Sequence, residues 1–122
     1  MHQKSIITIK TLGTMALSFN PFVCVNDFDE INEFVEKEAY DKPLNVQRIY
    51  IGYPITEDGE MDEFYHNEDN PLTTLRDLMM EINSIIDREV KAGHNYAPHV
   101  IEDYCIEIVE VTDDVCCVDV GS

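Results

Sequence analysis

Apolar residues recur at helical intervals between residues 72 and 90, and this stripe constrains the fold more than any other feature of the chain. A spacing of three and four residues places such side chains on one face of an amphipathic helix. Asn70 and Pro71 fit a helix start, as a capping residue followed by proline, and Gly93 fits a helix end. We predict a helix of about 22 residues whose buried stripe is Leu72, Leu75, Met79, Ile82, Ile86 and Val90.

A second, shorter helical pattern follows Asp27. Asp27 and Glu30 have the spacing of a capping box, with aspartate in the place of the usual serine or threonine. The pattern predicts a helix over residues 28 to 39, with an apolar face formed by Phe28, Ile31, Phe34 and Val35. The opposite face is acidic and carries Asp29, Glu30, Glu33, Glu36 and Glu38.

Several segments alternate apolar and polar residues with the period of two that is typical of β-strands. Residues 5 to 11 and 14 to 19 flank Gly13, and we predict that they pair as an antiparallel hairpin. Residues 46 to 55 are rich in β-branched and aromatic side chains, which predicts a strand near the centre of a sheet.

The C-terminal part of the chain returns to the same period. Residues 100 to 111 alternate until Val109, where we expect a β-bulge, and residues 115 to 120 follow a turn at 112 to 114 as a last strand. The bulge is expected to turn Ile108 and Val111 inward and Glu107 and Glu110 outward.

Together these elements predict an α+β protein with a single domain over residues 1 to 122. Its mainly antiparallel sheet of four to five strands would pack against two helices. The chain is 44% hydrophobic, which is enough for a core without disulfides, so we expect its four cysteines to be reduced. No apolar run approaches the length of a membrane span and the N-terminus does not resemble a signal peptide. We expect a cytoplasmic protein that binds no membrane.

Negative charge limits the partners of the chain. The sequence has 25 Asp and Glu residues and 8 Lys and Arg residues, for a net charge of −17 at pH 7. Such a charge repels nucleic acid and anionic lipid and attracts basic surfaces. We therefore expect a basic protein as partner and no direct binding of nucleic acid. Lys and Arg are absent from residues 49 to 75 and 92 to 122, where the field is concentrated.

The predicted contact surface lies mainly in residues 56 to 70, which we interpret as a polar loop. Aromatic residues beside the carboxylates would supply the desolvated anchors that charge alone does not; the alternative is that Phe64 and Tyr104 are core residues. The predicted partner-binding residues are Glu57, Asp58, Glu60, Asp62, Glu63, Phe64, Tyr65, Glu68 and Asp69, followed as second choice by Glu107, Glu110, Asp113 and Asp114.

No motif indicates catalysis or a cofactor. The acidic run at residues 57 to 63 lacks the ligand spacing of an EF-hand, and the histidines and cysteines lack the paired spacing of a zinc site. A Gly-rich phosphate loop and a nucleophile elbow are also missing from the sequence. We expect a protein that is not an enzyme and uses neither metal nor cofactor.

The charge pattern favours a nucleic-acid mimic that blocks the basic groove of a nuclease or CRISPR effector. In size and charge the chain resembles the small acidic inhibitors of phages and mobile elements, including anti-CRISPR and anti-restriction proteins, and also acidic immunity proteins for basic toxins. This resemblance is one of composition and implies no functional residues. The alternative from another class is a small structural or assembly module, such as a homodimer, whose acidic coat serves solubility.

Overall fold

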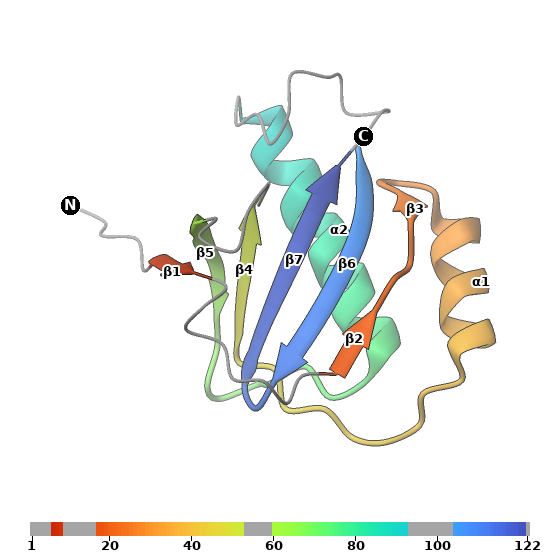
Figure 1. Ribbon diagram of the computed structural model, residues 1–122, viewed down its shortest axis with the longest axis horizontal. Helices are drawn as coiled ribbons and strands as arrows, with labels where there is room; N and C mark the ends of the chain where they lie inside the picture. Colours follow the sequence, from red (N-terminus) through yellow and green to blue (C-terminus); the bar gives the residue numbers. More distant parts are fainter. Residues whose placement is uncertain (1–5, 9–16, 53–59, 93–103, 122) are drawn as a thin grey trace.

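The computed structural model describes residues 6–8, 17–52, 60–92 and 104–121, which form two helices and one sheet of seven strands (Figure 1). This confirms the predicted α+β class, although the sheet has seven strands instead of the predicted four to five. The elements in chain order are β1 (Ile6–Thr8), β2 (Leu17–Phe19), β3 (Val23–Cys24), α1 (Phe28–Glu38), β4 (Arg48–Gly52), β5 (Glu60–His66), α2 (Leu75–Lys91), β6 (Cys105–Thr112) and β7 (Val115–Gly121).

The sheet has the strand order β1-β5-β4-β7-β6-β2, and β3 also pairs with β6. All of these pairs are antiparallel except the central pair of β4 and β7, which is parallel. The mainly antiparallel sheet that the sequence predicts is therefore confirmed. β6 and β7 form a hairpin whose turn contains Asp113 in the left-handed region, at φ 54°.

The expected hairpin between the first two strands is wrong. β1 pairs with β5, whereas β2 pairs with β6, so the two strands lie at opposite edges of the sheet (Figure 1). Alternation of apolar and polar residues predicts that a segment is a strand, but it does not select the strand it pairs with. β1 covers the outer edge of β5, and β2 covers the outer edge of β6. Without these two strands, both edges would be unpaired.

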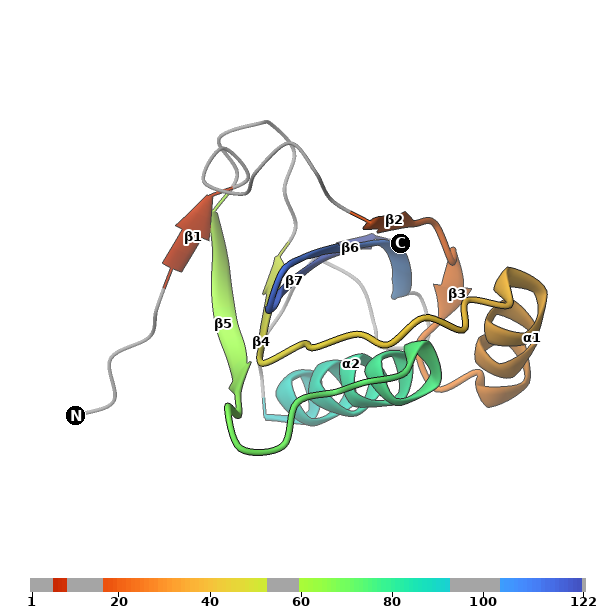
Figure 2. The ribbon, with the colours of Figure 1, turned by 90° about the horizontal axis from the view of Figure 1, so that it is seen from below.

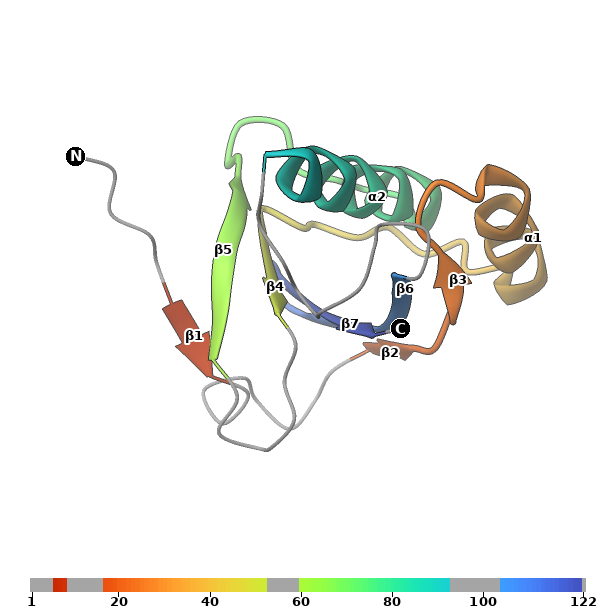
Figure 3. The same cartoon turned by 90° about the horizontal axis from the view of Figure 1, so that it is seen from above.

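The core lies between α2 and the concave face of the curved sheet, as Figures 2 and 3 show. From the sheet it takes fully buried side chains such as Ile49 and Val118, and from the helix it takes most of the predicted stripe. The buried α2 residues are Leu75, Leu78, Met79, Ile82, Asn83, Ile85 and Ile86.

α2 begins four residues later than the predicted start. Its N-cap is Thr74, whose Oγ1 accepts the N–H of Asp77 at 3.1 Å. The backbone of Leu72 cannot join the helix because its N–H and C=O pair with Val46 at 2.9 and 3.0 Å. Thr74 and Asp77 have capping-box spacing, so the sequence contains a better signal than Asn70 and Pro71.

α1 occupies the predicted residues and is tied to the rest of the fold by polar contacts. Asp27 caps it by accepting the N–H of Glu30 at 3.0 Å. The carboxylate of Glu30 does not return to Asp27, as in a full capping box, but accepts the N–H of Cys24 at 2.9 Å. Cys24 pairs with Cys105 across the strands, and both thiols are free with their Sγ atoms 4.0 Å apart.

β5 lies within the segment that the sequence predicts to be a loop. Residues 60 to 66 pair with β1 and β4, and the register passes from Ile49 opposite Tyr65 to Tyr50 opposite Glu63. Phe64 is therefore the extra residue of a β-bulge, which breaks the period of two. Acidic residues are also depleted in strands, so neither propensity nor periodicity indicates this one.

The bulge in β6 is real but lies at Glu107 instead of Val109, because the register with β7 shifts between Ile106 and Ile108. Val109 and Val111 are buried as a result, whereas Ile108 is only partly buried. The predicted inward position is correct for Val111 and wrong for Ile108.

Candidate partner-binding face

One face of the sheet is not crossed by either helix, and we refer to it as the helix-free face (Figures 2 and 3). Side chains alternate between the two faces of a strand. Ile49, Ile51 and Val118 point into the core, so Tyr50 and Cys117 point to the helix-free face.

A row of paired residues crosses this face from strand to strand. The register joins them directly, and directly paired residues share a face. In the order β5, β4, β7, β6 and β2, the row is Glu63, Tyr50, Cys117, Glu110 and Ser18. Tyr50 and Cys117 at its centre are only 3% and 4% exposed, and carboxylates stand on both sides of them. Glu63 comes from the first acidic segment predicted for the contact surface and Glu110 from the second. The two residues therefore lie on the same face of the sheet.

A second carboxylate group lies beside this row on β6 and β7. Asp119 pairs with Ile108, and burial together with the charges of Glu107 and Glu110 raises its pKa to about 6. The carboxylate of Glu107 lies over Gly121, in the space that a Cβ at that residue would fill. Among the described residues, no Lys or Arg forms an ion pair with these carboxylates.

The buried thiols of β7 are held in the protonated form. Burial and the charge of Glu110 raise the pKa of Cys117 to about 12, and burial raises the pKa of Cys116 well above its usual value. A thiol attacks as its thiolate, so neither cysteine supplies a nucleophile at neutral pH.

A second acidic region lies at one end of the sheet, where β5 ends and β4 begins. Glu68 Oε1 lies 3.2 Å from His66 Nε2 and 4.0 Å from Arg48. The carbonyl of Asp114, in the turn between β6 and β7, accepts the N–H groups of Gln47 and Arg48 at 2.8 and 3.1 Å. This end carries the predicted contact residues Glu68, Asp69, Asp113 and Asp114, but its charge is partly balanced by the nearby Arg48.

The other predicted contact residues have different environments. Glu57 and Asp58 lie outside the described residues, and for Glu60 and Asp62 the structure places the backbone in β5. Phe64 and Tyr65 pack against the core and Tyr104 is fully buried, as the alternative interpretation expects for Phe64 and Tyr104.

Sequence reasoning omitted Asp119 from the contact surface. The signal for it was the period of two in residues 115 to 120, which places Asp119 on the same face as Cys117. The acidic face of α1 does not join this surface, because α1 lies beside β3, at the other end of the sheet from β5 (Figure 1).

No protein-family model matches the chain, and neither a curated protein nor a solved structure does. Within residues 6–8, 17–52, 60–92 and 104–121, no three His, Cys, Asp or Glu side chains are grouped so as to hold a metal ion. The helices of this same part of the chain are too short or too polar to span a membrane.

The crowding at Asp119 predicts a pH-dependent gain in stability for Asp119→Asn. A carboxyl group whose pKa is raised on folding favours the folded state below its ordinary value of 3.8, and this contribution is lost as the pH rises through about 6. Near neutral pH the variant should therefore be more stable by about 1–2 kcal/mol, after a discount for solvent screening.

Urea unfolding near pH 7.5 and near pH 4.5 checks this, with Asp41→Asn as a control that removes one exposed charge elsewhere. The gain should shrink at the lower pH for Asp119→Asn. An equal gain for both variants at both values would show that only net charge matters and would contradict the local cause.

Proposed function

We propose that this protein is a non-enzymatic inhibitor that binds a basic protein through its helix-free face. Its partner would be a nuclease or CRISPR effector whose nucleic-acid groove it occupies as a mimic of the phosphate backbone. This is a function of the anti-CRISPR or anti-restriction type. Such a target is intracellular, so the proposal places the protein in the cytoplasm.

The observation that carries this proposal is that carboxylates from three strands share one face, and that among the described residues none of them pairs with a Lys or Arg. Glu63, Glu110 and Asp119 come from β5, β6 and β7, and none of these strands contains Lys or Arg. Burial, together with the neighbouring charges of Glu107 and Glu110, disfavours the ionised form of Asp119 and raises its pKa. A cationic partner relieves that repulsion, because a nearby opposite charge favours the ionised form.

A capture experiment followed by an activity assay tests the proposal. The protein is immobilised at low salt, exposed to host-cell lysate, and the bound proteins are identified as the salt concentration rises. The enzyme that elutes last is purified and its binding to duplex DNA and to RNA is measured with and without this protein.

The expected result is a nucleic-acid-binding enzyme that loses its nucleic acid when this protein is added, and whose association weakens with salt. A strongly captured partner that keeps its nucleic acid at saturating concentrations of this protein would contradict the proposal.

A further inference from the structure

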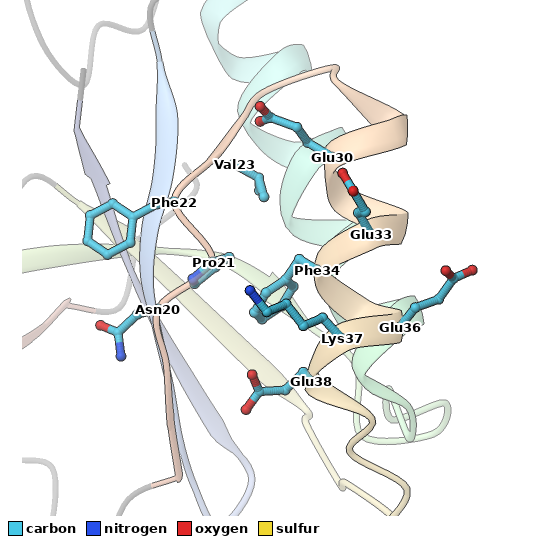
Figure 4. A pocket seen from close by; sticks show the side chains of 10 residues that line it. All are labelled: Asn20, Pro21, Phe22, Val23, Glu30, Glu33, Phe34, Glu36, Lys37 and Glu38. Atoms are coloured by element: carbon cyan, nitrogen blue, oxygen red, sulfur yellow. The ribbon is translucent and has the colours of Figure 1, made fainter.

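A groove of about 870 Å³ separates α1 from the segment that joins β2 to β3 (Figure 4). Residues 20 to 23 form one wall and α1 forms the other. The floor between them is apolar: Val23 is 4% exposed, and Phe34 extends from the helix toward Pro21 while its ring packs against the core. Such a surface suits one apolar side chain of a ligand.

The rim of the groove is acidic. Figure 4 shows the carboxylates of Glu33 and Glu38 near its two ends, and both residues are exposed. Glu30 also borders the groove, but its carboxylate already accepts the N–H of Cys24 at 2.9 Å. Glu36 also lines the groove, but its carboxylate points away from residues 20 to 23 (Figure 4).

Among the described residues that line the groove, Lys37 is the only Lys or Arg. The side chain of Lys37 extends from α1 across Phe34 toward Pro21 (Figure 4). Within the described part of the chain Lys37 has no ion pair. The alkyl chain of Lys37 lies over Phe34, and its ammonium group lies between Glu33 and Glu38. A lysine or arginine of a ligand would adopt the same arrangement.

We propose that this groove binds a short basic peptide segment of a partner protein. An apolar side chain of the peptide would rest on Phe34, and flanking lysines or arginines would lie beside Glu33 and Glu38. The peptide would displace the side chain of Lys37, which competes for the same place. This groove lies between α1 and residues 20 to 23, at the other end of the sheet from β5, so it is a second binding surface besides the proposed inhibitory face.

Charge complementarity favours this occupant over the two nearest alternatives. A second copy of the chain brings a net charge of −17 of its own, which opposes its docking against an acidic rim. The N-terminal strand β1 is held by β5 at the opposite edge of the sheet, so it cannot fill the groove of its own molecule.

Fluorescence anisotropy with a synthetic peptide tests the proposal. The probe is a short labelled peptide in which one leucine is flanked by arginines, and a matched peptide carries glutamine in place of every arginine. With the arginine peptide, Glu33→Gln combined with Glu38→Gln should weaken binding about tenfold, because two partly exposed ion pairs are lost. Lys37→Gln should strengthen it about threefold, since the competing cation is gone.

Glu36→Gln is the control for a single charge removed from the same helix, because the Glu36 carboxylate points away from residues 20 to 23. Its affinity should stay within about twofold of the parent protein. Circular dichroism confirms that each variant is folded, and a gain of affinity in Lys37→Gln cannot arise from unfolding.

Absence of binding at millimolar peptide, equal binding of the two peptides, or equal loss in the double variant and in Glu36→Gln would overturn the proposal. Variants of Glu63, Glu110 and Asp119 on the sheet should leave peptide binding unchanged. The peptide experiment can therefore contradict the groove proposal without contradicting the proposed role of the helix-free face, and the reverse also holds.

Discussion

Replacing Asn83 with alanine is expected to lower the free energy of unfolding by about 2–3 kcal/mol. Asn83 is only 3% exposed, and its side chain binds Asn26 twice. Its Oδ1 accepts the N–H of Asn26 at 2.6 Å, and its Nδ2 donates to Asn26 Oδ1 at 3.0 Å. These bonds hold Asn26 in the left-handed region at φ 69°, directly before the cap of α1.

The free energy of unfolding falls because the substitution removes both hydrogen bonds and leaves the N–H of Asn26 without its partner. Urea unfolding near neutral pH measures it. Ser84→Ala is the matched control, since Ser84 is the exposed neighbour on the same helix. An equal change in the two variants would show that the paired amides contribute little to the attachment of α1 to α2.

Neutralising three carboxylates of the helix-free face should slow association with the captured enzyme about tenfold at low salt. The variant combines Glu63→Gln, Glu110→Gln and Asp119→Asn. It removes charge from the surface that we propose to face the basic groove, so the long-range attraction falls. Urea unfolding of the triple variant shows whether it is folded, so that slower association is not assigned to unfolding.

The control variant removes three charges from α2, on the other side of the sheet. It combines Asp77→Asn, Glu81→Gln and Glu89→Gln, none of which lies on the helix-free face. Stopped-flow association at several salt concentrations compares the two triple variants. Equal slowing would show that net charge alone sets the rate and that the helix-free face has no special role.

The helices were predictable because their signals are local. Asp27 caps α1 through a residue three positions away, and the stripe from Leu75 to Ile86 needs only the helical period to be recognised. The start of α2 was misplaced because Leu72 pairs with Val46, which is distant in sequence. A backbone group that is engaged by a distant segment cannot also begin a helix.

The sequence indicated part of the composition of the candidate site, without Asp119, but not its geometry. Glu63 and Glu110 were both expected at the contact surface, yet their common face depends on a parallel pair of β4 and β7 that no local pattern indicates. Two bulges, at Phe64 and Glu107, also shift the period that would have assigned each side chain to a face. Strand pairing is a property of the whole chain, so it had to come from the structure.

Competition on the partner tests the central claim most directly. The affinity of this protein for the captured enzyme is measured at rising concentrations of the nucleic acid that the enzyme binds. If the helix-free face occupies the nucleic-acid groove, the apparent Kd should rise in proportion to the nucleic-acid concentration, without a ternary complex. An apparent Kd that stays constant while enzyme, nucleic acid and this protein form one complex would contradict it.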